Sequence, residues 1–235
     1  MCPYYETILQ IVNGNNASSE WKSWITDAIS AGTTLIAAFS GAWYAFRLSS
    51  KNENRKLIQD QLAAGNRAIF ILLRQFNELS AIQHQLINPH RDDPQRYINM
   101  SPALALEFSH LRVDVDSISY LLETDDRQVL LDIIVEEERF QTAIRAINER
   151  SEFLYETIQP LFAKSGLTNG QEYSDDYIKS ILGENHFVHL QKSTEQSIQI
   201  VDETILSLMQ IGQRLRNILT KLYPKDTIIG FNKRI

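Results

Sequence analysis

The chain of 235 residues contains one cysteine, Cys2, so no disulfide bond can form within it. It has no CxxC pair, no glycine-rich phosphate loop and no nucleophile elbow, which are short signatures of many enzymes. The formal net charge is −6 and charges of both signs are mixed along the chain, which argues against a broad basic face for duplex DNA. We therefore expect a protein that is not an enzyme and has no cofactor.

Clusters of ionisable side chains offer little for catalysis. Glu136, Glu137 and Glu138 are consecutive, so their carboxylates point around a helix, and we favour a solvated face over a di-metal bundle. His186 and His189 are three residues apart, which suits two ligands of one metal ion, but no third ligand is evident nearby. We expect no catalytic residue and no metal site.

Charged residues are also missing between Ala28 and Phe46, which read AISAGTTLIAAFSGAWYAF. At about 1.5 Å of rise per residue, a helix of this length covers the hydrocarbon core of a bilayer, roughly 30 Å. Trp24 and Trp43 lie near its ends, where amphipathic rings favour the membrane interface. We predict a transmembrane helix over residues 25–46. The alternative is a buried core helix of a soluble protein.

The charges on either side of this segment predict its orientation. Basic residues follow it, with only Glu53 opposing them: Arg47, Lys51, Arg55 and Lys56. Lysine and arginine accumulate on the cytoplasmic side of membrane proteins. We predict a single-pass protein of the bacterial inner membrane, with residues 1–24 extracytoplasmic and the C-terminal domain in the cytoplasm.

The two sides of the apolar segment differ in size and polarity. Small and hydroxyl-bearing residues share one side at helical spacing: Ser30, Thr33, Thr34, Ala37, Gly41 and Tyr44. In lipid, small residues let helix backbones approach and hydroxyls bond across the contact. We predict that this face packs against other copies in a homo-oligomer, and a pore is the narrower version. An anchor that happens to be rich in alanine is the alternative.

The rest of the chain has the spacing of apolar residues that is typical of helices. No proline occurs between the apolar segment and Pro89, so we expect one helix to run on to about Leu86. Further helices are expected over residues 102–123, 126–163, 175–182 and 185–222. These predict an all-α fold: a single transmembrane helix that continues into a cytoplasmic antiparallel bundle of about four long helices, residues 47–223.

Both ends of the chain carry shorter features. Residues 4–12 are expected to form a short interfacial helix, and the polar residues 13–19 a loop. Residues 224–235 form a basic tail that also holds Ile228, Ile229 and Phe231. We expect this tail either to touch the anionic inner leaflet or to be disordered.

Three arginines within apolar helical stretches are candidates for contact with an anionic ligand: Arg67, Arg74 and Arg112. A guanidinium group matches the geometry of phosphate, and a neighbouring copy could complete the pocket. Ordinary surface ion pairs with the abundant acidic residues are the alternative.

The helix with the Ser30, Thr33, Thr34 and Gly41 face, followed by an α-helical remainder, resembles single-span membrane effectors of bacterial anti-phage systems, among them the channel effector of Hailong-type systems. The resemblance implies a homo-oligomeric channel held shut by a nucleotide or oligonucleotide on the cytoplasmic bundle. No ligand-binding residue can be carried over from it.

These observations lead to one function hypothesis and two alternatives. The first is a homo-oligomeric inner-membrane effector, a ligand-gated channel or pore that disrupts the membrane in anti-phage defence. The second is a passive membrane-anchored scaffold whose bundle docks a partner protein, encoded nearby. The third is a membrane-tethered metal or catalytic bundle.

Overall fold

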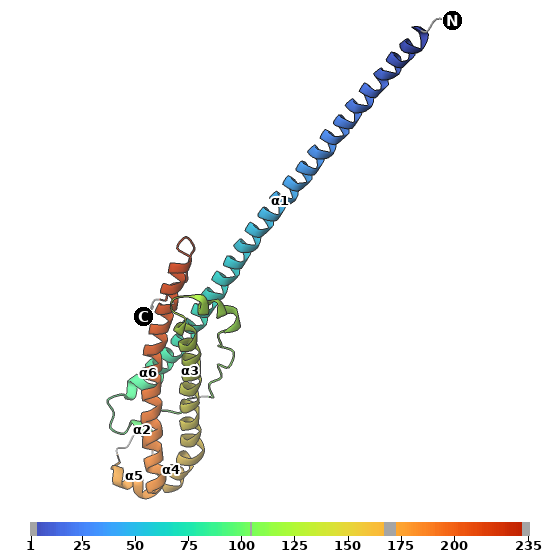
Figure 1. The fold of residues 1–235 in the computed structure, drawn as a ribbon. Coiled ribbons are helices and arrows are strands. Elements are labelled where there is room, and N and C mark those ends of the chain that lie inside the picture. The colour runs from blue at the N-terminus through green and yellow to red at the C-terminus, as the bar shows by residue number, and fades with distance from the viewer. Residues whose placement is uncertain (1–3, 104, 167–172, 232–235) are drawn as a thin grey trace. The chain divides into compact units, whose positions relative to one another are not determined.

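The computed structural model describes residues 4–103, 105–166 and 173–231, with side chains described within those ranges for Trp24 and from Ala28 onward. Every regular element in these ranges is helical and none is a strand, so the all-α prediction is confirmed. The elements are α1 (Tyr4–Ile82), η1 (Gln83–Ile87), η2 (Asn88–His90), α2 (Arg96–Asn99), η3 (Asp116–Glu123), α3 (Gln128–Phe153), η4 (Leu154–Ile158), α4 (Gln159–Ser165), α5 (Asp175–Leu182) and α6 (Glu184–Leu222) (Figure 1).

The chain divides into two compact units, residues 1–59 and residues 60–235, and helix α1 continues through the boundary. The prediction of one unbroken helix from the apolar segment onward is confirmed. The loop expected over residues 13–19 is wrong, because α1 already begins at Tyr4. Asparagine, serine and glycine each cost a helix at most about 1 kcal/mol, and lengthening an existing helix adds a hydrogen bond per residue.

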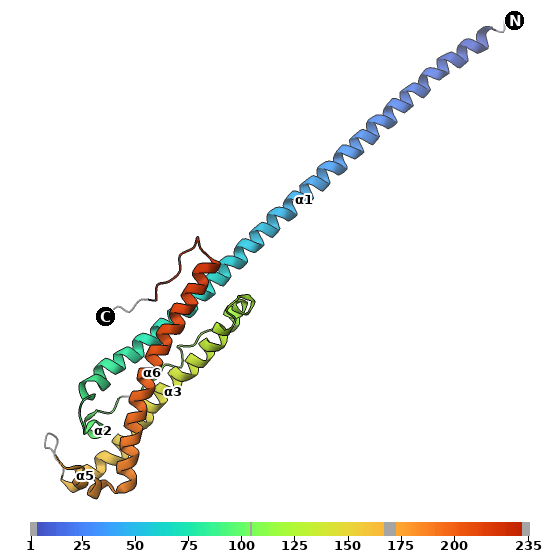
Figure 2. The ribbon, with the colours of Figure 1, turned by 60° about the vertical axis from the view of Figure 1, so that its left-hand side comes forward.

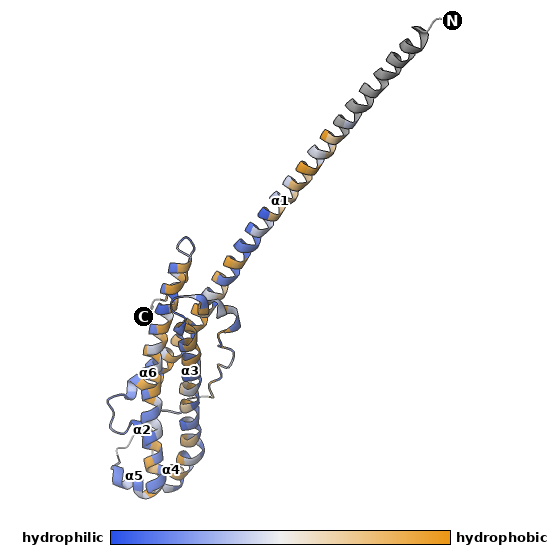
Figure 3. Ribbon diagram, in the orientation of Figure 1, coloured by the Kyte–Doolittle hydropathy of each residue, from blue (hydrophilic) through white to orange (hydrophobic). Residues whose placement is uncertain are grey.

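Figure 3 shows apolar residues recurring along α1 after its grey part, followed by a hydrophilic stretch of the same helix. None of the helices, as far as their residues are described, combines the length and the apolar character needed to cross a bilayer. The transmembrane assignment of residues 25–46 remains a prediction.

The second unit is built around α3 and α6, which lie side by side in both views (Figures 1 and 2). They run antiparallel, because Arg150 of α3 bonds to Thr194 of α6 while Glu136 bonds to Ser207. The last part of α1 packs against this pair through side chains. The three helices contribute these core residues among others: Ile69, Leu72, Phe76, Leu79, Ile133, Phe140, Ile147, Val201, Leu208 and Leu215.

The helix predicted over residues 102–123 is wrong. Residues 101–103 and 105–115 form an irregular segment, and only the 3₁₀ helix η3 follows it. The side chain of Ser151 accepts a hydrogen bond from the backbone N–H of Ala103 at 3.0 Å, and other α3 side chains bond to the segment farther along. Because these bonds satisfy backbone groups from outside, the segment does not need a helix of its own. The described chain therefore has three long helical stretches, not four.

The helix predicted over residues 126–163 is present but contains a change of pitch. It runs from Gln128 to Ser165 as α3, the π-helical turn η4 and α4. Pro160 is the second residue after that turn and has no N–H to donate into the preceding turn. A π-helical turn shifts the hydrogen-bond register at this point, and the chain remains helical beyond the proline.

The last two helices match their predicted bounds closely. Gly183 separates α5 from α6 with a φ of +74°, a left-handed value that glycine adopts without strain. Ser174 caps α5 by accepting a hydrogen bond from the N–H of Tyr177. Helix α6 ends at Leu222, just before Pro224.

Candidate functional site

Large apolar side chains are exposed along residues 28–46 of α1. Six of them are 56% to 76% exposed: Ile29, Leu35, Ile36, Phe39, Trp43 and Phe46. A Cβ added at Gly41 would meet no other described atom within 4 Å. Removing apolar surface from water stabilises by about 25 cal/mol per Å², so a contiguous surface of this kind is typical of a contact with lipid or protein.

Two hydroxyl groups on the predicted packing face, those of Thr33 and Thr34, bond to carbonyls of their own helix. Thr33 Oγ1 lies 2.9 Å from the carbonyl oxygens of both Ile29 and Ser30, and Thr34 Oγ1 donates to the carbonyl of Ser30 at 2.8 Å. All six predicted residues are exposed: Ser30, Thr33, Thr34, Ala37, Gly41 and Tyr44. The face is thus open, and the packing role stays a prediction.

The three candidate arginines come from two elements. Arg67 and Arg74 belong to α1, and Arg112 belongs to the irregular segment. Arg67 and Arg112 are exposed and Arg74 is half-buried. None of them lines either pocket described below. The anionic-ligand role therefore also stays a prediction.

A different arginine, Arg150, is buried in the bundle and was missed by the sequence analysis. It is 1% exposed, and its guanidinium donates to the carbonyls of Met100 at 2.6 Å and Tyr97 at 3.3 Å and to Thr194 Oγ1 at 2.9 Å. No carboxylate among the described residues pairs with it. Burial lowers the pKa of Arg150 to about 10, so the group remains charged at neutral pH.

Arg150 therefore joins α2 and Met100, which follows it, to α3 and α6. One signal in the sequence could have revealed it. Arg150 is three residues after Ile147 and four before Leu154, which places it in the apolar stripe of its helix.

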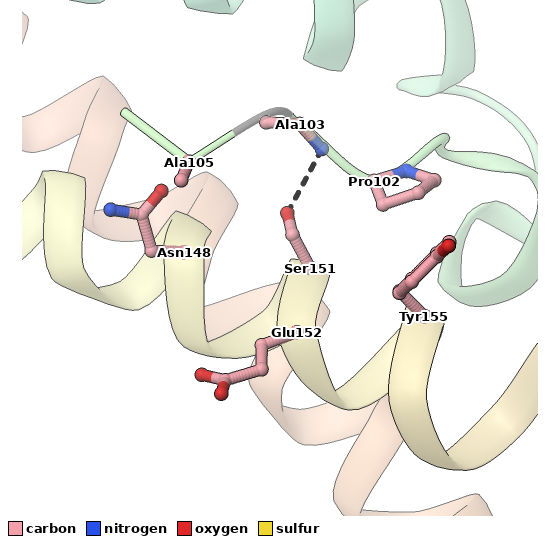
Figure 4. Close-up of a pocket in the computed structure, with 7 residues that line it drawn as sticks. All are labelled: Pro102, Ala103, Ala105, Asn148, Ser151, Glu152 and Tyr155. Atoms are coloured by element: carbon pink, nitrogen blue, oxygen red, sulfur yellow. Dashed lines mark hydrogen bonds between the residues drawn. The ribbon is translucent and has the colours of Figure 1, made fainter. Parts of the chain in front are cut away.

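A pocket of about 610 Å³ lies where the irregular segment crosses α3 (Figure 4). Its lining consists of Pro102, Ala103, Ala105, Asn148, Ser151, Glu152 and Tyr155. Ser151 points at the backbone of Ala103, whereas the carboxylate of Glu152 is directed away from that bond. The lining has one acidic and no basic side chain, so it does not suit an anionic ligand.

A second pocket of about 670 Å³ lies between α2 and α6. Arg96 in its wall is already paired with Glu195, through Nε–Oε1 at 2.6 Å and Nη2–Oε2 at 2.7 Å. Lys192 is the other basic side chain in the lining. The bidentate pair occupies the guanidinium group, and this leaves little positive charge for a phosphate.

The interpretation of the three consecutive glutamates as one solvated face is wrong for two of them. Glu136 is buried and accepts hydrogen bonds from Arg139 at 3.0 Å and from Ser207. Glu137 is half-buried and accepts from the N–H of Val113 at 2.6 Å. Burial raises its pKa above the ordinary value. Each carboxylate bonds to a residue of another element, and the sequence pattern had not indicated these contacts.

The two histidines pack against a ring. The centroids of His186 and His189 lie 5.9 Å and 4.5 Å from that of Phe153. No group of three side chains able to hold a metal ion occurs among the described residues.

The C-terminal tail packs on the bundle as far as it is described. Phe231 is 3% exposed and belongs to the main core, and Ile228 and Ile229 pack against that core. The protein itself therefore covers Phe231, whereas Ile228 and Ile229 are half-buried and their contact with the inner leaflet remains a prediction. Lys233 and Arg234 lie outside the described residues.

Compared with models of known protein families, with curated proteins and with solved structures, the chain matches none of them.

Proposed function

We propose that this protein is a homo-oligomeric membrane effector whose α1 segment over residues 25–46 lies in the bilayer and associates with the same segment of other copies. The observation that carries the proposal is the row of exposed large apolar side chains on a stretch of helix without charge. Lipid would cover the bulky side, which includes Ile36 and Phe39. Other copies would cover the small side, which includes Ala37 and Gly41.

The polar atoms of this segment favour the proposal. Ser30, Thr33 and Thr34 lower its mean hydropathy, but the hydroxyls of Thr33 and Thr34 already bond to backbone carbonyls. A hydroxyl that is satisfied within its own helix costs much less in lipid than a free one. Contact between copies would also remove this face from the hydrocarbon.

The end of the segment supports an interfacial position. The guanidinium carbon of Arg47 lies 5.3 Å from the centre of the Trp43 ring, a cation–π arrangement. Tryptophan and arginine at one helix end are typical of the membrane–water boundary on the cytoplasmic side.

The bundle would control the oligomer. Two tyrosines hold Gln61 of α1: Tyr120 donates to its carbonyl at 2.8 Å, and Tyr223 donates to its side chain at 2.9 Å. A ligand that changed these contacts would act on the helix that continues into the apolar segment. The resemblance to Hailong-type channel effectors favours a gated pore and a role in anti-phage defence.

The test is ion flux through liposomes that contain the purified full chain. Leucine at Gly41 or Ala37 should block close packing and abolish flux, because it adds bulk to the small face. Leucine at Ile36, on the bulky face, is the matched control and should leave flux unchanged. Equal flux from all variants would contradict the proposal. Membrane attachment without any flux would favour the passive scaffold.

A further inference from the structure

Residues 227–231 are held in the bundle as an extended peptide would be held by a receptor. The side-chain amide of Asn66 in α1 accepts a hydrogen bond from the N–H of Ile229 at 2.9 Å and donates to the carbonyl of Thr227 at 3.3 Å. One side-chain amide thus bonds to the peptide backbone at two points, and neither bond involves a side chain of the peptide. Backbone contacts of this kind, combined with side-chain pockets, are the usual means of binding an extended peptide.

The aromatic side chain of Phe231 is enclosed farther along the same peptide. Phe231 packs edge-to-face on Phe76, with ring centroids 5.9 Å apart and planes inclined by 64°. Its ring also lies directly on the backbone of α6 at Gly212, where an added Cβ would come within 2.4 Å of the ring. Glycine within a helix costs about 1 kcal/mol relative to alanine. The absent side chain at Gly212 is what makes room for the ring.

The connection between α6 and this peptide is an exposed turn. Residues 224–227 are all exposed, and a hydrogen bond from the N–H of Asp226 to the carbonyl of Tyr223 closes the turn. Opening it would expose Phe231 and leave α6 itself intact. Residues 227–231 can therefore separate from α1 and α6 without unfolding these helices.

We propose that the groove formed by Asn66, Phe76 and Gly212 is a peptide-binding site that accepts the C-terminal segment of a second copy of this chain. Every copy carries both the groove and the peptide that fits it. An exchange between two copies would keep the contacts of Ile229 and Phe231 and change only the exposed turn, which is the condition for swapping an element. The inference requires no membrane and goes beyond the proposed function.

Two complementary variants test the exchange. Phe231→Ala leaves the groove open and removes the anchor from the tail. Gly212→Ala keeps the tail and fills the pocket. Full-length chains with different tags are co-expressed in the three combinations and purified through one tag. The mixed pair should be recovered together in greater yield than either variant with itself, because only the mixed pair has one free tail and one free groove.

Equal recovery of all three pairs would overturn the inference. Association through the apolar part of α1 contributes equally to every pair, so that outcome would leave the proposed function standing. Conversely, enrichment of the mixed pair without flux in liposomes would support the exchange and contradict the pore.

A binding measurement keeps the inference falsifiable if one variant folds poorly. Ile229→Pro removes the N–H that donates to Asn66 and one side chain that packs against the core, but it leaves Asn66, Phe76 and Gly212 unchanged, so it should also free the groove. A fluorescent peptide of residues 224–231 should bind the Ile229→Pro chain saturably, as followed by anisotropy. The same chain with Gly212→Ala added should lose this binding. No saturable binding to the Ile229→Pro chain would overturn the inference, and circular dichroism checks that each variant is helical.

Discussion

Asn148 of α3 and Leu106 of the irregular segment are joined by two hydrogen bonds that run in opposite directions. The amide oxygen of Asn148 accepts from the N–H of Leu106 at 2.9 Å, and its amide nitrogen donates to the carbonyl of Leu106, also at 2.9 Å. A single side chain thus satisfies both backbone groups of Leu106, as a neighbouring strand would. These bonds explain how the irregular segment, whose apolar residues have helical spacing, lies beside α3 without forming a helix.

Arg150 should be a large contributor to the stability of the bundle. Arg150→Met would leave the carbonyls of Met100 and Tyr97 without their donor, and a loss of about 2 to 4 kcal/mol in the free energy of unfolding is expected. Urea denaturation of the full chain measures it. Arg145→Met, at an exposed position of the same helix, is the control and should cost much less. An equal loss in both variants would show that the buried bonds add nothing.

Glu137 should make the bundle less stable at neutral pH than at mildly acidic pH. Burial raises its pKa above the ordinary 4.5, so the folded chain binds this proton more tightly than the unfolded chain. Stability from this group therefore increases as the pH falls through the raised folded pKa. Glu137→Gln keeps an acceptor for the N–H of Val113 and removes the charge. The variant should be more stable than the natural chain at pH 7, and the difference should shrink on acidification.

The same comparison with Glu138→Gln supplies the control, because Glu138 is exposed. A difference between the Glu137→Gln variant and the natural chain that stayed constant with pH would count against titration of Glu137 as the cause.

Asp202 should stabilise the bundle more at neutral pH than at acidic pH, which is the opposite of the effect of Glu137. The hydrogen bond from Arg91, at 2.8 Å, lowers the pKa of this carboxylate, and a bond from Gln83 acts in the same direction. Its contribution is present above the unfolded pKa and is lost as the pH falls through the folded pKa. Asp202→Asn should cost up to about 1 kcal/mol at pH 7, since the pair is partly exposed, and nothing once the carboxylate is protonated. Thermal unfolding between pH 7 and pH 3 would test this, and a cost independent of pH would argue against it.

Gly65 should not tolerate alanine. A Cβ there would lie 2.7 Å from a methyl carbon of Leu219 and 2.8 Å from the hydroxyl of Tyr120. The crowding should lower the melting temperature of the bundle, although alanine favours helix. Gly32→Ala is the matched control in the same helix, because no described atom lies within 4 Å of its added Cβ. A higher melting temperature for Gly65→Ala would mean that the bundle adjusts freely at this point.

Local signals were sufficient for several elements. The bounds of α5 and α6 follow from Ser174 as a cap, Gly183 as a break and Pro224 as a stop, which all act within a few residues. The apolar spacing that is typical of helices continues beyond residue 60, and Leu72 and Phe76, which follow this spacing, are buried in the core. The bonding partners of Glu136 and Arg150 could not be predicted, because each partner lies many positions away along the chain.

By itself, the sequence determined that the chain is helical, where its last helices begin and end, and that one uncharged apolar stretch precedes a polar domain. These features depend on backbone propensity and on the periodic spacing of side chains, which act over a turn or two of helix. Only the tertiary structure decided that residues 101–103 and 105–115 are irregular, that Arg150 is buried among carbonyls and that Phe231 packs against Gly212. In each of these cases the backbone or side-chain groups are satisfied by residues far along the chain, and contacts of that kind exist only after the helices have packed.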